Sequence, residues 1–84
     1  MRAIRLRGFG PAEALEPVDV EDPRPGPGQV RIAVRAAGVQ LVDTAVRRGA
    51  GPWRPELPVV PGSEVTGVVD AVGAGVPDGW LGRR

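Results

Sequence analysis

The sequence of 84 residues contains no cysteine, histidine, lysine or tyrosine. Without cysteine the chain has neither a disulfide framework nor a thiolate nucleophile. Without cysteine and histidine it cannot build an ordinary zinc site from sulfur and nitrogen ligands. Histidine-base, Schiff-base and tyrosyl-acid chemistry are excluded as well, and the single serine, Ser63, has no histidine or lysine to activate it. The chain therefore offers few side chains for covalent or acid–base catalysis.

The charges are nearly balanced, with eleven arginines, ten acidic residues and a net charge of +1. Because the arginines and the acidic residues are interspersed, we expect no nucleic acid partner. No apolar run approaches the roughly 18 residues that a membrane span needs. The N-terminus also lacks the apolar core of a signal peptide. We therefore expect a cytoplasmic domain with no membrane partner.

Glycine and proline are abundant, with 13 and 10 residues respectively. Such a share is also found in low-complexity or disordered chains. Leu, Ile, Val and Phe, however, occupy 22 positions, which is more than disordered chains with a high net charge usually contain. The order of the residues decides between the two, because alternating segments separated by Gly and Pro favour short strands joined by turns.

Two segments near the N-terminal half alternate clearly between apolar and other residues. Residues 29–37 show the most regular alternation, and residues 2–7 place Ile4 and Leu6 on one face. Side chains two residues apart share a face of a strand. Both segments are therefore predicted to be strands with one face turned to a core.

Three further segments complete the predicted β-structure. Residues 14–20 form a weaker candidate, because Pro17 suits an edge strand or a bulge. Residues 63–72 carry valines on both faces, which predicts a strand covered on both sides. Residues 79–84 are typical of a turn that leads into another strand.

One short helix is predicted over residues 41–48, where apolar residues recur with helical spacing. Asp43 lies in its first turn, and Arg47 and Arg48 lie in its last turn, so their charges complement the helix dipole. Gly49 follows as a left-handed C-cap. The helix is therefore bounded by local signals at both ends.

Residues 50–62 are rich in proline and predict an irregular segment, in which Trp53 packs over a barrel or into a cleft. Several short strands, turns rich in Gly and Pro, and a single short helix indicate a mainly β chain. From the pattern alone, the architecture is a barrel or a sandwich.

The segment 72–79 resembles part of a dinucleotide-binding fingerprint, with Gly73 and Gly75 at the first two glycine positions. The third glycine position is Asp78, and Pro77 disfavours helical geometry before it. The motif requires a helix N-terminus directed at pyrophosphate. We therefore interpret the segment as a hairpin turn.

Two pairs of charged residues leave alternatives open. Asp43 and Glu64 could form a carboxylate pair for general acid/base work, or Asp43 could favour the helix start while Glu64 pairs with an arginine. Arg47 and Arg48 could hold a phosphate, or they could form a solvated helix end. The residues by themselves favour the structural alternative in both cases.

Three segments, taken in this order, resemble a known family. They are residues 29–34 after a Pro-x-Pro-Gly turn, residues 36–44 followed by Arg-Arg-Gly, and residues 57–69. Together they are similar to the GroES-like N-terminal catalytic domain of the medium-chain dehydrogenase/reductase superfamily. The resemblance covers essentially the whole chain and implies a GroES-like, partly open β-barrel over residues 1–84.

Departures from the zinc-dependent members point to one branch of this superfamily. Those members carry Cys two residues after the glycine that matches Gly38, where this chain has Gln40. Their Gly-His-Glu motif has Ser63 in place of His. The sequence is therefore more similar to the zinc-free, quinone-oxidoreductase-like branch. That branch often has Tyr where this chain has Ala45, so the resemblance does not extend to a quinone-specific site.

The resemblance implies hydride transfer from NADPH or NADH to a small carbonyl, enone or quinone, without zinc. It also implies that Gln40 faces the nicotinamide and substrate cleft near Asp43, Thr44 and Pro61. Glu64 and Asp43 would shape the cleft and would not perform chemistry. The catalytic residues remain unknown.

In this superfamily a Rossmann domain follows the GroES-like part and binds most of the cofactor. We therefore expect the 84 residues to be a truncated product, a fragment or half of a split enzyme, inactive without a Rossmann-domain partner. A second hypothesis is a stand-alone barrel acting as an interaction module, similar in architecture to the GroES co-chaperonin. A third is a non-functional product with an open barrel edge.

Overall fold

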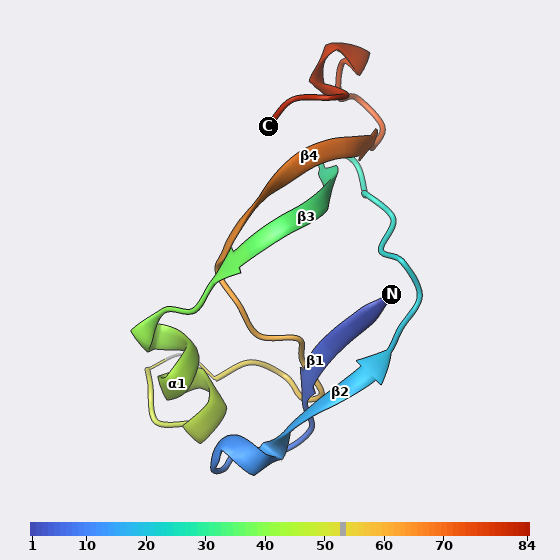
Figure 1. The fold of residues 1–84 in the computed structure, drawn as a ribbon. Coiled ribbons are helices and arrows are strands. Elements are labelled where there is room, and N and C mark those ends of the chain that lie inside the picture. Colours follow the sequence, from blue (N-terminus) through green and yellow to red (C-terminus); the bar gives the residue numbers. More distant parts are fainter. Residues whose placement is uncertain (53) are drawn as a thin grey trace. The chain divides into compact units, whose positions relative to one another are not determined.

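The computed structural model describes residues 1–52 and 54–84, so the predicted packing of Trp53 lies outside the described residues. It contains mainly strands and one short helix, as predicted (Figure 1). The strands are β1 (Arg2–Leu6), β2 (Leu15–Asp19), β3 (Val30–Gly38) and β4 (Glu64–Val72). The helix is α1 (Leu41–Arg48), and single 3₁₀ turns occupy Ala12–Ala14 and Asp78–Trp80.

The chain divides into two compact units. The first unit consists of Met1–Glu21 and Gly38–Glu64, and the second consists of Asp22–Ala37 and Val65–Arg84. The first unit contains β1, β2 and α1, whereas the second contains most of β3 and β4. All five residues predicted to line a cleft lie in the first unit.

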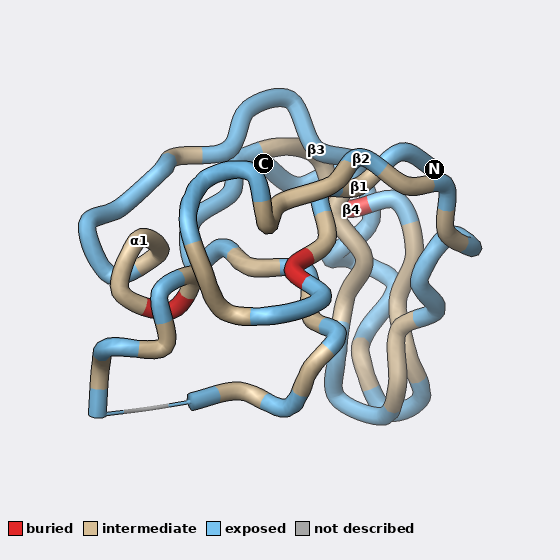
Figure 2. The backbone as a smooth tube through the Cα atoms, turned by 90° about the horizontal axis from the view of Figure 1, so that it is seen from below, coloured by how far each residue is buried: buried red, intermediate tan, exposed pale blue. Residues whose placement is uncertain are grey.

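In the first unit, β1 and β2 pair antiparallel, with Arg2 opposite Asp19 and Leu6 opposite Leu15. Leu6 also exchanges two backbone hydrogen bonds with Val59, at N···O distances of 2.7 and 3.0 Å. This contact covers the end of β1, and Leu6 is completely buried. Figure 2 shows the buried positions in red.

The prediction that Ile4 and Leu6 share a buried face is only half right. Leu6 is fully buried, but 49 % of Ile4 is exposed. The reason is tertiary, because the irregular segment that carries Val59 bridges to Leu6. Alternation along the strand assigns both residues to one side but does not show how far the covering segment extends.

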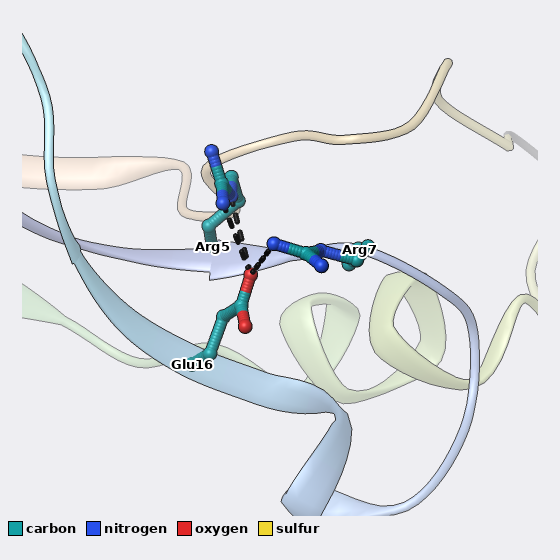
Figure 3. Close-up of polar contacts among 3 residues, drawn as sticks. All are labelled: Arg5, Arg7 and Glu16. Atoms are coloured by element: carbon teal, nitrogen blue, oxygen red, sulfur yellow. Dashed lines mark hydrogen bonds and ion pairs between the residues drawn. The ribbon is translucent and has the colours of Figure 1, made fainter.

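Two arginines share one carboxylate on the β1–β2 sheet (Figure 3). Arg5 and Arg7 approach Oε1 of Glu16 at 3.2 and 3.1 Å. Arg5 and Glu16 lie opposite each other in the strand register, which accounts for their contact. Arg7 is more exposed and follows the end of β1.

Helix α1 begins and ends where the sequence predicts. Gly49 adopts the left-handed conformation with φ of 68°, and its N–H donates to the carbonyl of Val46 at 3.1 Å. A Cβ at this position would also overlap the Phe9 ring. Val46 is buried and anchors the helix within the first unit.

In the second unit, β3 and β4 form a two-stranded antiparallel sheet (Figure 1). The missing side chain at Gly67 lets β4 lie close to β3, because a Cβ there would overlap the backbone carbonyl of Ala33. The guanidinium Nε of Arg31 donates to Asp70 at 2.8 Å. This hydrogen bond, together with the charge of Asp70, raises the pKa of Arg31 above its ordinary value.

The prediction that β4 is covered on both sides is wrong at its first half. Val69 is buried, but Val65 is 45 % exposed. Residues near the end of the chain pair only with the centre of the strand: Val69 donates to the carbonyl of Arg83 at 2.8 Å and accepts from Gly82 at 2.9 Å. These two bonds extend the pairing of β4 where the sequence predicts a turn leading into another strand, although residues 79–84 contain no strand.

The turn predicted in the glycine-rich segment is confirmed, but it does not join two strands, because residues 73–84 contain none after β4 ends at Val72. Gly73 donates to the carbonyl of Gln29 at 2.8 Å, and Gly28 donates to Ala74 at 3.0 Å, so the turn closes against the start of β3. Gly75 has a φ of 80°. No α-helix starts in the described residues after this turn, which excludes a dinucleotide fingerprint in this segment.

Candidate functional site

Gln40 contacts two of the other predicted cleft residues, Asp43 and Glu64. It is the N-cap of α1, and its backbone N–H donates to Oδ2 of Asp43 at 2.8 Å. Its side-chain Nε2 donates to Oε2 of Glu64 at 2.7 Å. The two carboxylates therefore hold the same residue, one at its backbone and the other at its side chain.

These contacts decide between the alternatives for the two acidic residues. Asp43 stabilises the helix start, as the structural alternative predicts. The expected arginine partner of Glu64 is wrong, because its carboxylate accepts from Gln40. The sequence signal for this partner is weak, since 24 residues separate the two side chains.

Thr44 is not brought into the same network. Its hydroxyl donates to the carbonyl of Leu41 at 2.7 Å, within the first turn of α1. A serine or threonine hydroxyl in a helix commonly makes such a local bond. Thr44 therefore belongs to the helix that carries the site, and its hydroxyl is engaged within that helix and not with Gln40 or Glu64.

A cavity of about 290 Å³ adjoins this network within the first unit. Asp43 and Pro61, two of the predicted residues, lie in its wall together with Ser63. The remaining lining is mostly apolar and consists of Val42, Val46, Pro55, Val59, Val60 and Gly62. Val42 and Val60 were not among the predicted cleft residues, because isolated valines in a helix and a loop are typical of any core.

Apolar side chains flank Gln40 and remain open to solvent. Val39 and Leu41 are 83 % and 84 % exposed, and Val42 is 53 % exposed. Gln40 is exposed as well, so the site presents an uncharged amide between apolar groups.

The arginines at the end of α1 have different surroundings. Nε of Arg48 donates to the carbonyl of Thr44 at 3.3 Å, and the rest of this exposed side chain fits a solvated helix end. Arg47 is only partly exposed, and its Nε has no hydrogen-bond partner among the described residues. Arg54 stacks over the ring of Phe9 at 4.6 Å from its centroid.

The donor chemistry around Gln40 does not suit zinc. Zinc in proteins prefers thiolate and imidazole ligands, and the chain has neither cysteine nor histidine. Within residues 1–52 and 54–84, no three acidic side chains gather as metal ligands. In the same described ranges, no helix is long and apolar enough to cross a membrane.

Comparison with known proteins finds relatives among quinone oxidoreductases and VAT-1 homologs. Over 77 residues the chain is 47 % identical to rat quinone oxidoreductase, covering 90 % of this chain and 23 % of that protein. It is 44 % identical over 86 residues to the rat synaptic vesicle membrane protein VAT-1 homolog, covering all of this chain and 21 % of the relative. The chain thus spans less than a quarter of the length of these two relatives.

Solved structures show the same fold. A mycobacterial protein solved in complex with NADPH superposes with a TM-score of 0.87 at 44 % identity, covering 94 % of this chain and 24 % of that one. This agreement confirms the predicted mainly β, GroES-like fold. The model of the alcohol dehydrogenase GroES-like domain matches residues 26–84. The chain therefore belongs to the family of alcohol dehydrogenase GroES-like domains, and its relatives include quinone oxidoreductases.

Proposed function

We propose that this chain forms the substrate side of the active site in a zinc-independent, NAD(P)H-dependent oxidoreductase. The observation that carries the proposal is the exposed side-chain amide of Gln40, which Glu64 holds, next to exposed apolar side chains; Asp43 holds the backbone of the same residue. Its substrates would be small carbonyl, enone or quinone compounds, and the identity to rat quinone oxidoreductase supports this class. Because Ala45 stands where the quinone-oxidoreductase-like branch often has Tyr, the proposal names no particular quinone.

The uncharged amide of Gln40 and the exposed apolar side chains next to it fit a nicotinamide ring, and the nearby carboxylates of Asp43 and Glu64 are engaged by Gln40 itself. When bound, the reduced nicotinamide supplies the hydride. We propose that a Rossmann domain, on the same polypeptide or on a partner chain, binds most of the cofactor. The NADPH complex of the mycobacterial neighbour supports a nicotinamide cofactor.

In this proposal the chain binds and orients and carries out no covalent step. Gln40 offers its amide to the ligand, and Asp43 holds the backbone from which that amide projects. Pro61, together with Val42 and Val60, provides an apolar wall that displaces water from the reacting region. Thr44 stabilises the first helical turn, which carries Val42 and Asp43.

The donor set supports the proposed zinc independence. The two positions where zinc-dependent relatives carry Cys and His are Gln40 and Ser63, which are poor ligands for zinc. Gln40 is also engaged with Glu64, so its amide nitrogen is already committed to a carboxylate. Hydride transfer in the complete protein is therefore expected to survive removal of metal.

A chimera tests the proposal. The 84 residues would replace the matching segment of rat quinone oxidoreductase, with which 77 residues align. We expect NADPH oxidation that depends on an added quinone and continues in the presence of a metal chelator. Loss of that activity on adding chelator would contradict zinc independence. Lack of activity in a folded chimera that still binds NADPH would contradict the proposed function.

The isolated chain provides the complementary measurement. We expect no turnover and no tight NADPH binding by the 84 residues, because the groups that hold the nucleotide would lie elsewhere. NADPH fluorescence titrated with the purified chain measures this directly. Submicromolar binding would overturn the expectation that a separate domain is required.

A further inference from the structure

Gln40 has a fixed orientation that its sequence position does not explain. Its Nε2 donates to Oε2 of Glu64 at 2.7 Å. An ionised carboxylate can only accept hydrogen bonds, so the nitrogen of the amide must face Glu64. The carbonyl oxygen Oε1 is consequently directed away from Glu64, toward the backbone N–H of Asp43 at the start of α1, which leaves one of its two lone pairs for a ligand.

Gly38 makes room for this arrangement. A Cβ at Gly38 would overlap the carboxylate of Glu64, and the three atoms nearest to it all belong to that side chain. The backbone of Gly38 does not require glycine, because its φ is not positive. The missing side chain at Gly38 therefore serves the placement of Glu64, and through it the placement of Gln40.

The bond to Glu64 also changes what Gln40 offers a ligand. An amide that donates to an anion gains electron density on its oxygen, because hydrogen bonds in a chain polarise one another. Oε1 becomes a stronger acceptor, and the second N–H becomes a weaker donor. Gln40 is thus suited to accept a hydrogen bond and is poorly suited to polarise a substrate carbonyl.

We propose that Glu64 is a positioning residue. Its carboxylate occupies the space left by the missing side chain of Gly38 and fixes the orientation of Gln40, which then accepts a hydrogen bond from the ligand. The proposal rests on the proposed function, in which Gln40 faces the nicotinamide and the substrate. The ligand group is an N–H or O–H donor, either the carboxamide of the cofactor or the hydroxyl that reduction produces. Asp43 holds the backbone of Gln40 and completes the arrangement.

The amino-acid composition permits a direct test. The chain contains no asparagine, and Gln29 and Gln40 are its only glutamines. A nitrogen–proton NMR spectrum therefore contains only two side-chain carboxamide pairs. Gln29 provides an internal control, since its amide oxygen accepts from the backbone N–H of Gly26 in the other unit.

We expect one Gln40 amide proton to resonate downfield, and the pair to be less mobile than a free carboxamide. Gly38→Ala and Glu64→Ala should move the Gln40 pair towards free values and leave the Gln29 pair in place. Glu56→Ala, which removes another exposed glutamate of the first unit, is the matched control. A wild-type Gln40 pair with free values, or one unchanged in both variants, would overturn the tether irrespective of any activity.

Kinetics of the active chimera test the role toward the ligand. Glu64→Gln and Gly38→Ala should lower kcat/KM by about tenfold or more, and Glu56→Gln should not. The donor to Gln40 is either the cofactor carboxamide or the product hydroxyl. The reduced 3-acetylpyridine analogue of NADPH distinguishes them, because it lacks the carboxamide N–H groups. If Gln40→Leu removes a preference for NADPH over this analogue, Gln40 accepts from the cofactor. If it lowers kcat equally with both, Gln40 accepts from the product hydroxyl.

The two proposals fail in different ways. An active chimera in which Gln40→Leu changes neither rate nor cofactor preference would overturn the role of Gln40 as an acceptor. An inactive, folded chimera whose Gln40 pair still responds to Gly38→Ala would overturn the proposed function and leave the tether intact. The NMR and kinetic results are therefore independent of each other.

Discussion

The backbone N–H of Gln40 donates a 2.8 Å hydrogen bond to Oδ2 of Asp43, three residues further along the chain. In return, the backbone N–H of Asp43 donates to the carbonyl of Gln40 at 3.0 Å. The first N–H groups of a helix have no partners within the helix, and a negative charge is favourable there. This reciprocal pair sets the position at which α1 begins and from which the Gln40 side chain projects.

Removing the carboxylate of Asp43 should destabilise the first unit. We expect Asp43→Ala to lower the free energy of unfolding by about 1 kcal/mol, the usual net value of one such hydrogen bond. Urea denaturation followed by circular dichroism measures the change. Glu56→Ala removes the same charge from an exposed position and should have little effect. Equal stabilities of the two variants would show that the bond contributes nothing.

The two apolar side chains of β1 should respond very differently to truncation. Leu6 is fully buried, so Leu6→Ala should lower the free energy of unfolding by about 3 kcal/mol, since a cavity remains. Ile4 is 49 % exposed, and Ile4→Ala should cost less than about 1 kcal/mol. Thermal and urea unfolding of both variants tests this, and similar losses would contradict the burial of Leu6 alone.

A methyl group at Gly67 should disturb the β3–β4 sheet. Its Cβ would overlap the backbone carbonyl of Ala33, which cannot rotate away as a side chain can. We expect Gly67→Ala to cost about 1–3 kcal/mol. Gly79→Ala is the control, because nothing lies within 4 Å of its added Cβ. Amide hydrogen exchange in β3 should increase in the first variant only.

The shared carboxylate of Glu16 should contribute modestly and in a salt-dependent way. Both of its arginine contacts are partly exposed, so Glu16→Gln should cost less than about 1 kcal/mol at low ionic strength. The difference from the wild type should shrink as salt is added, because salt screens exposed charges. Glu13→Gln, an exposed position nearby, should show no comparable salt effect; a difference for Glu16→Gln that persists in high salt would contradict an electrostatic origin.

Local signals in the sequence predict the secondary structure well. The limits of α1 follow from Asp43 and Gly49, since a carboxylate and a left-handed glycine act within one turn of a helix. The four predicted strands agree with the observed strands to within a residue at most ends. The turn at residues 73–75 is predicted for the same reason, because its glycines act locally.

The candidate site is only partly accessible to the same reasoning. The amino-acid sequence places Gln40 and Glu64 near a cleft by resemblance, whereas the structural alternative drawn from the residues alone pairs Glu64 with an arginine. Its partner is Gln40, because the start of β4 meets the turn before α1 in the folded first unit. Gly38 marks an interruption in a strand pattern, whereas its function as a gap depends on a side chain 26 positions further on.

The sequence by itself determined the absence of thiolate and imidazole, the ends of the helix and the order of strands and turns, because each depends on residue type or on neighbours within a few positions. Only the tertiary structure decided that Leu6 is buried while Ile4 is exposed, and that a carboxylate orients the amide of Gln40. Burial and hydrogen-bond partners depend on segments distant in the chain, and the pattern of one segment does not specify which other segment covers it.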